Sequence, residues 1–217
     1  MEGRKQMDIE GKEKLREVIE WIICIVIAVV LALAVRHFIF TPTVVRQVSM
    51  KETLQNGDRL VLDRWSITRG KGIERGEIIT FEAPSSTKST HDENSPVATY
   101  TNQPTGIFSK FLYYVLEVNK ESYIKRVIGV AGDHVLIEDG KVYLNGEELK
   151  EEYLAEGMQT PRTGHYYDIT VPDGYVFAMG DNRTGSKDCR EFGCIPLEKI
   201  ESKVLFRFWP FNKFGSV

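Results

Sequence analysis

Residues 134–146 read HVLIEDGKVYLNG, two short apolar runs on either side of Asp139-Gly140. Asp and Gly tolerate the positive φ angles of a two-residue hairpin turn, so this stretch predicts two antiparallel strands. Similar short apolar runs, bounded by Gly, Asp or Asn, occur at RLVLDRW (59–65), EIITFEA (77–83), YIKRVIGVAG (123–132), GYVFAMG (174–180) and KVLFRFW (203–209). The pattern predicts a mainly β domain whose strands are mostly antiparallel.

The composition limits the kinds of protein this can be. The chain has 217 residues, 42% of them hydrophobic, which suffices for one principal domain and a membrane segment. A net charge of -3 lacks the basic footprint that nucleic acid selects, so nucleic acid is not an expected partner. The four histidines lie far apart in the sequence, which predicts no metal site and no cofactor. Cys189 and Cys194 either form a bridge or stay free thiols.

An uncharged run, WIICIVIAVVLALAV, occupies residues 21–35, and apolar residues resume at 38–40. A helix over residues 21–40 spans roughly 30 Å, enough to cross a bilayer. The alternatives are a buried helix, a cleaved targeting peptide and an interfacial helix. No other segment is apolar enough to surround the run, no cleavage site of small residues follows it, and it has no polar face.

We therefore expect a single transmembrane anchor at residues 21–40. The tail at residues 1–20 carries more Lys and Arg than the stretch after the anchor, which predicts a cytoplasmic N-terminus. Residues 41–217 then form the extracytoplasmic domain.

Two segments leave alternatives open. The first part of residues 83–120 is rich in Ser, Thr, Pro and Asn and predicts a mobile, variable loop. Its second part, IFSKFLYYVLEV (107–118), fits a short amphipathic helix or a surface that touches lipid. The aromatic run FRFWPFNKF (206–214) fits a closing core strand or an interfacial belt, and we favour the core strand.

The residues with chemical potential gather in three blocks: VSMKETLQNGDRLVLDR (48–64), SYIKRVIGVAGD (122–133) and MGDNRTGSKDCREFG (179–193). A serine nucleophile needs a base to accept its proton. The chain has no Gly-x-Ser-x-Gly elbow and no histidine with an evident acidic partner, which leaves lysine as the candidate base.

Lys125 lies within an apolar strand, where burial favours the neutral amine. Lowering a lysine pKa from about 10.4 to about 8 costs roughly 3 kcal/mol of charge stabilisation. The alternative is an ordinary lysine whose charged end reaches solvent from a half-exposed strand.

Together the blocks resemble those of the bacterial type I signal peptidases. Residues 49–58 match that family's Ser-Met-x-Pro-Thr-Leu followed by Gly-Asp, except that Glu52 replaces the proline. Residues 123–133 match Tyr-x-Lys-Arg-x-x-Gly-x-x-Gly-Asp. Residues 180–190 match Gly-Asp-Asn-Arg followed by Ser-x-Asp-Ser-Arg, with Cys189 in place of the second serine. With the anchor and the terminal FRFWP, the likeness covers most of residues 20–210.

The resemblance implies a membrane-bound serine endopeptidase with a Ser-Lys dyad. It would remove the N-terminal signal peptides of exported preproteins, as a single-pass protein of a bacterial cell membrane, in contact with the lipid bilayer and near the protein export machinery. The implied fold is an antiparallel β-rich catalytic core with a smaller β extension, here at about residues 134–178, behind one N-terminal transmembrane helix.

The resemblance also assigns roles to particular residues. Ser49 would be the nucleophile and Lys125 the general base, and the oxyanion would be held by the backbone N–H of Ser49, with Gln47 as a possible second donor. Ser186 would hydrogen-bond and orient the lysine. The pairs that would hold the site in shape are Asp181 with Arg126 and Asp188 with Arg190, unless they are surface ion pairs worth under about 1 kcal/mol.

Two departures from the family pattern keep other functions open. Glu52 removes a fixed φ angle close to the nucleophile, and Gln47 stands where some members have Ser or Gly. The alternatives are a serine-lysine protease with one dedicated substrate and an inactive anchored β domain that binds peptides.

Overall fold

The computed structural model describes residues 2–38, 40–85, 96–101 and 103–217. The chain divides into two compact units, residues 1–39 and 40–217. The first unit contains one helix, α1 (Glu2–Phe38). Within it, Lys14–Val35 has a mean hydropathy of 3.0, is long enough to cross a bilayer, and is not buried by any other part of the described chain. The apolar N-terminal helix predicted from the sequence is therefore present.

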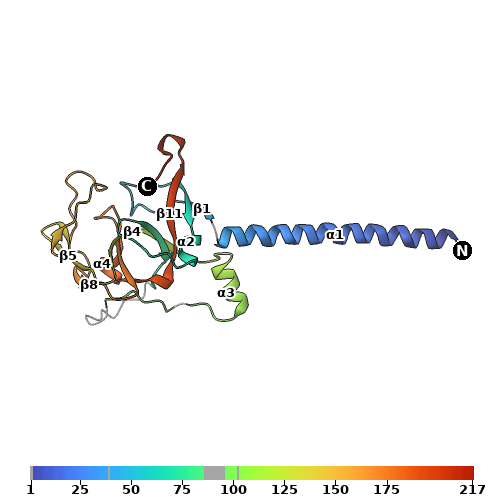
Figure 1. Ribbon diagram of the computed structural model, residues 1–217, viewed down its shortest axis with the longest axis horizontal. Helices are drawn as coiled ribbons and strands as arrows, with labels where there is room; N and C mark the ends of the chain where they lie inside the picture. Colours follow the sequence, from blue (N-terminus) through green and yellow to red (C-terminus); the bar gives the residue numbers. More distant parts are fainter. Residues whose placement is uncertain (1, 39, 86–95, 102) are drawn as a thin grey trace. The chain divides into compact units, whose positions relative to one another are not determined.

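The second unit is built on two antiparallel sheets (Figure 1). In spatial order the seven-stranded sheet consists of β1 (Phe40–Val44), β2 (Arg59–Asp63), β11 (Ile200–Trp209), β3 (Ile78–Glu82), β4 (Ser122–Val130), β9 (Tyr175–Met179) and β10 (Ile195–Pro196). The four-stranded sheet consists of β7 (Glu147–Glu148), β6 (Lys141–Leu144), β5 (His134–Glu138) and β8 (Asp168–Thr170). The predicted mainly β, antiparallel fold is confirmed.

The smaller sheet is an insertion in the chain between β4 and β9. Its β5–β6 hairpin turns at Asp139 and Gly140, whose φ angles of 50° and 77° are those the sequence predicted for this turn. Val135 and Ile137 of β5 are fully buried in the same apolar cluster as Phe81 of β3 and Phe177 of β9. The two sheets therefore share one core, although β5 and β8 project to one side of the unit in Figure 1.

Short helices connect the strands. They are α2 (Trp65–Thr68), α3 (Ile107–Tyr114), α4 (Cys189–Phe192) and the 3-10 turns Leu197–Lys199 and Phe211–Lys213. The predicted mobile loop falls partly on residues 86–95 and 102, which lie outside the described residues. Of the two possibilities for residues 107–118, the structure contains the amphipathic helix, α3.

The C-terminal aromatic run forms a strand as far as Trp209, but its assignment to the core is wrong. Trp209, Phe211 and Phe214 are exposed, and Phe206 and Phe208 are only half-buried. The reason lies in the pairing of β11. Its pairing with β3 ends at Lys203, so the last six residues of the strand pair with β2 on one side and have only the isolated bridge from Arg207 to Gly215 on the other.

Candidate active site

Ser49 lies in a tight turn between β1 and β2. Met50 and Leu54 are fully buried beneath the turn, and the Leu54 N–H donates to the Met50 carbonyl at 2.6 Å. The backbone N–H of Asn182 donates to the Ser49 carbonyl at 2.9 Å. The turn that contains Ser49 is therefore held by the packing of Met50 and Leu54 and by a hydrogen bond from the third block, and Ser49 is buried.

Lys125 reaches Ser49 from the middle of β4. Its Nζ donates to Ser49 Oγ at 2.8 Å and to the carbonyl of Ile124 at 3.1 Å. The Lys125 side chain is 1% exposed, so the alternative of a lysine reaching solvent is wrong. Burial lowers the pKa of Lys125 to about 8, against the opposing pull of the Asp188 carboxylate. A large fraction of the amines is thus neutral at mildly alkaline pH.

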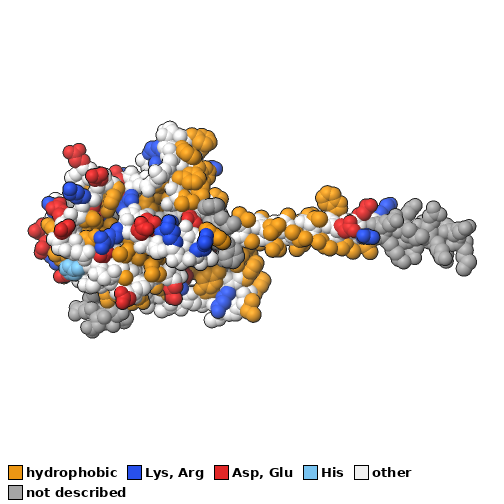
Figure 2. Space-filling model, viewed as in Figure 1, with side chains coloured by type: hydrophobic (Ala, Val, Ile, Leu, Met, Phe, Trp, Pro, Cys, Tyr) orange, Lys and Arg blue, Asp and Glu red, His pale blue; other side chains and the backbone are white. Residues whose placement is uncertain are grey.

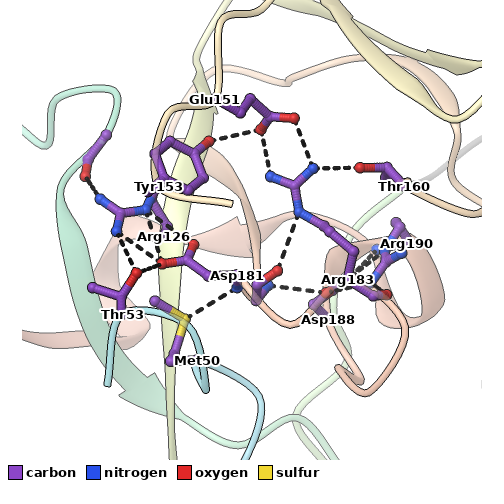
Figure 3. Close-up of polar contacts among 12 residues, drawn as sticks. Met50, Thr53, Arg126, Glu151, Tyr153, Thr160, Asp181, Arg183, Asp188 and Arg190 are labelled. Atoms are coloured by element: carbon purple, nitrogen blue, oxygen red, sulfur yellow. Dashed lines mark hydrogen bonds and ion pairs between the residues drawn. The ribbon is translucent and has the colours of Figure 1, made fainter. Parts of the chain in front are cut away.

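The two expected charge pairs both form, and both are buried rather than on the surface (Figure 3). Arg126 donates from Nε to Asp181 at 3.0 Å and from Nη2 at 2.8 Å, while Thr53 donates its hydroxyl proton to the same carboxylate. Arg190 and Asp188 are both fully buried, with two contacts of 2.8 Å. Asp181 thereby joins the turn that contains Ser49 to the strand that contains Lys125.

The Asp188 carboxylate also fixes the backbone of the third block. It accepts from the Gly180 N–H at 3.0 Å and caps α4 by accepting from the Arg190 N–H at 3.3 Å. Arg190 in turn donates to the carbonyl of Arg183 at 2.8 Å. Because a charge buried without partners is costly, these contacts make the loop from Gly180 to Arg190 a rigid support.

Sequence reasoning missed a third arginine pair, Arg183 with Glu151, which links the β extension to the site (Figure 3). Arg183 also donates to Thr160 at 2.5 Å and to the Gly180 carbonyl at 3.2 Å. Tyr153 donates to Glu151 at 2.7 Å, and its ring lies 4.1 Å from the Arg126 guanidinium carbon. Residues 151–160 lack strand periodicity and belong to none of the three blocks, so no sequence signal marked them.

The sequence singled out three further residues, Ser186, Gln47 and Glu52, and one expectation, the contact of Ser186 with Lys125, is wrong. The Ser186 hydroxyl is buried without a hydrogen-bond partner, so the expected contact with Lys125 is not formed; the lysine donates to Ser49 and Ile124 instead. Gln47 is half-buried and lines a cleft. Glu52 is exposed to solvent.

A cleft of about 420 Å³ is lined by residues close in sequence to Ser49 and Lys125, among them Gln47 and Ile124. Its lining includes Thr43, Val45 and Gln47 from the segment before Ser49, and residues 121–124 at the beginning of β4. β4 pairs with β3 from Ser122 onward but with β9 only from Arg126 onward, so its first residues have a strand on one side only within the described chain. An extended peptide fits such an edge.

Within the described ranges, no group of three His, Cys, Asp or Glu side chains is placed to hold a metal ion. Of the two possibilities for Cys189 and Cys194, the structure contains free thiols, both buried. Burial raises the pKa of the Cys194 thiol to about 12 and that of Cys189 well above its ordinary value, so neither is a ready nucleophile.

Comparison with known proteins gives one consistent family. The family model described as "Signal peptidase, peptidase S26" matches residues 18–209. Signal peptidase IB of Staphylococcus aureus is 32% identical over 215 residues, covering 92% of this chain and 93% of the relative. Signal peptidase I T of Bacillus subtilis is 33% identical over 210 residues, covering 94% and 91%. A crystal structure of a signal peptidase I from Enterococcus faecalis has 24% identity and a TM-score of 0.37, covering 61% of this chain and 97% of that one.

Proposed function

This chain belongs to the signal peptidase family of serine peptidases, peptidase S26, and on that premise we propose that it cleaves signal peptides with Ser49 as nucleophile and Lys125 as general base. The observation that carries the proposal is the 2.8 Å contact between Lys125 Nζ and Ser49 Oγ, formed by a lysine that is almost fully buried. A buried amine with a pKa of about 8 is suited to accept a proton near neutral pH.

The reaction runs through an acyl-enzyme. Neutral Lys125 takes the hydroxyl proton of Ser49 as Oγ attacks the scissile carbonyl, and the lysine then gives that proton to the leaving amine. A water molecule, deprotonated by the same lysine, hydrolyses the ester and releases Ser49. The Ser49 N–H donates to no acceptor within the described chain, which leaves it available for the oxyanion, with the Gln47 amide as a second donor.

Ser186 has a role in this proposal although its hydroxyl does not contact Lys125 in the structure. A buried hydroxyl without a partner is uncommon in a folded protein and calls for a functional explanation. We assign it to the step in which Lys125 has released Ser49 Oγ and needs another acceptor for its N–H groups. Asp181 with Arg126 and Asp188 with Arg190 act as positioning pairs.

The substrate is placed as an extended strand in the cleft lined by residues from 43–47 and 121–124. Main-chain hydrogen bonds to the edge of β4 would align the scissile bond with Ser49. Small residues one and three positions before the cut, the preference implied by the resemblance, would point into this cleft.

We place the enzyme in a bacterial cell membrane. The 22-residue apolar stretch of α1 supports a single transmembrane anchor, proposed at residues 21–40. The excess of Lys and Arg before it supports a cytoplasmic tail at 1–20 and an extracytoplasmic catalytic domain at 41–217, near the export machinery that delivers preproteins.

The experiment compares detergent-solubilised full-length variants on a preprotein, with the new N-terminus identified by sequencing. Ser49→Ala and Lys125→Ala are expected to lose cleavage, whereas Lys51→Ala, which alters an exposed lysine two residues from Ser49, should cleave normally. Cleavage by either dyad variant at close to the normal rate would remove the dyad assignment.

A further inference from the structure

The turn that contains Ser49 has a second attachment, to the far end of β11. Arg207 of this strand donates from Nη1 to the carbonyl of Thr53 at 3.0 Å and to the carboxylate of Asp58 at 2.9 Å. Thr53 follows Ser49 within the same turn, and Asp58 directly precedes β2. The Arg207 guanidinium thus connects two points of the segment between Ser49 and β2.

This ion pair is largely removed from solvent. The Arg207 side chain is 14% exposed and that of Asp58 is 5% exposed. The Asp58 carboxylate also accepts from the Gln55 N–H at 3.0 Å. Figure 2 shows hydrophobic side chains gathered on the surface at the end of the domain where Figure 1 draws the turn after β11. The exposed aromatic side chains here are Trp209, Phe211 and Phe214. Arg207 instead points inward, so it is not one of the surface pairs that contribute little.

The chain that follows β11 fixes the direction of the Arg207 side chain. The Arg207 Nε donates to the carbonyl of Lys213 at 2.9 Å. The backbones of Arg207 and Gly215 exchange two hydrogen bonds, at 2.8 Å and 3.1 Å. Val217 packs against the apolar cluster that includes Met50, the residue after Ser49. The end of β11 and the segment after it therefore lie against the turn as one support.

Thr53 is held from two sides. Its hydroxyl donates to Asp181, and its carbonyl accepts from Arg207. The preceding residue, Glu52, stands where the signal peptidase pattern has proline, so no ring fixes the φ angle at this point of the turn. Glu52 is exposed to solvent. The turn thus lacks a covalent restraint at residue 52, and charged side chains from two other parts of the chain hold the next residue.

We infer that Arg207 is a positioning residue for the nucleophile, which holds the Thr53 carbonyl so that the turn keeps Ser49 Oγ at its contact distance from Lys125 Nζ. The inference rests on the proposed function of Ser49 and Lys125. A misplacement of about 1 Å can cost roughly 10²-fold in rate, so a loosened turn slows the chemical step. Residues 122–124 of the cleft lining pair with β3, so substrate binding there does not depend on Arg207.

The first test separates positioning from substrate binding. Full-length Arg207→Met is compared in detergent with Arg59→Met, which alters an exposed arginine of β2 that lies 5.8 Å from the Trp209 ring. Both are assayed on a peptide well below their melting temperatures. We expect Arg207→Met to lower kcat about 10-fold with KM changed by less than about twofold, and Arg59→Met to alter neither.

A normal kcat in Arg207→Met, or a raised KM with a normal kcat, overturns the inference. If the methionine variant does not fold, Arg207→Gln replaces it with the same expectation, since it keeps a hydrogen-bond donor without the charge.

The second test does not need activity. Amide hydrogen exchange, followed by mass spectrometry, is expected to become several-fold faster over residues 48–58 in Arg207→Met and to stay unchanged in Arg59→Met. Residues 122–130 of β4 are the internal reference, where both variants should exchange as the unaltered chain does. Unchanged exchange over residues 48–58 overturns the inference. If the proposed function itself fails, the unaltered chain cleaves no peptide, while the exchange result still decides whether Arg207 holds the turn.

Discussion

Gly180 faces the carbonyl oxygen of Ser49 so closely that a Cβ atom on Gly180 would lie 2.4 Å from that oxygen and 2.2 Å from Ser186 Oγ. Real Cβ atoms do not approach a backbone oxygen to this distance, so the first and third blocks fit together only if this residue has no side chain. The carbonyl oxygen of Ser49 is moreover fixed by the Asn182 N–H, which leaves it little room to move.

Gly180→Ala is accordingly expected to displace the turn that carries Ser49 and to lower kcat at least tenfold, with a loss of stability of about 1–3 kcal/mol from overpacking. Gly72→Ala is the matched control, since a Cβ atom on Gly72 would meet no atom within 4 Å. Rates of peptide cleavage and thermal unfolding of both variants test this. Normal kcat in Gly180→Ala would show that the turn adapts.

The pH dependence of cleavage should report the titration of Lys125. Because burial lowers its pKa to about 8, kcat/KM should rise nearly tenfold per pH unit below that value and level off above it. Initial rates on a peptide without titratable groups, measured from pH 6 to pH 10, give the profile. A profile that is flat between pH 6 and pH 8 would exclude this lysine as the base.

The same titration affects stability. The pKa of Lys125 is lower in the folded state, at about 8, than its ordinary 10.5, so below pH 8 the fold must hold a charged amine in a buried site. We expect Lys125→Met to be inactive but more stable at pH 6–7, by up to about 3 kcal/mol. The advantage should shrink as the pH rises from 8 toward 10.5, where the unaltered lysine loses its charge in both states. Melting temperatures at several pH values in detergent measure it; a Lys125→Met variant that melts lower at pH 6–7 would contradict the prediction.

Asp181→Asn would leave the Arg126 guanidinium buried without a charged partner. Breaking one half of a buried pair costs about 3–5 kcal/mol, so this isosteric change should lower the melting temperature strongly and reduce activity as well. Asp168→Asn removes the partner of His134 in an exposed pair, and it should change stability by no more than about 0.5 kcal/mol. Similar effects of the two substitutions would show that burial does not set the strength of the Arg126 pair.

The sequence was sufficient for much of this fold. Apolar alternation and the Asp139-Gly140 turn located the strands, because these signals are local to a strand or a turn. The exposed end of β11 could not be predicted, since its exposure depends on how far the neighbouring strand β3 extends along it. The alternation of apolar residues within one strand contains no information on the length of the strand that pairs with it.

For the site, the three blocks contained Ser49 and Lys125, the proposed dyad, and the two charge pairs, but they did not predict the surroundings of these residues. Lys125 is buried because β4 is covered on both faces around it, by segments that are far away in the sequence. Glu151 and Tyr153 lie in an irregular segment, and their importance appears only once Arg183 and Arg126 lie beside them. A hydrogen-bonding network among residues so far apart has no local signature.

The contacts of Glu151 with Arg183 and of Tyr153 with Arg126 limit how such enzymes can be recombined. The insertion between β4 and β9 could be taken for a separate module. Its contacts with Arg183 and Arg126, however, connect it to the residues around the proposed active site. A chimera that receives another relative's insertion without an acidic group at position 151 would leave the buried Arg183 guanidinium without its charged partner. Without an aromatic ring at position 153, the Arg126 guanidinium would lose its ring contact, although it would keep its pairing with Asp181. Exchange of this module between relatives is therefore constrained by electrostatic compatibility with the host's arginines.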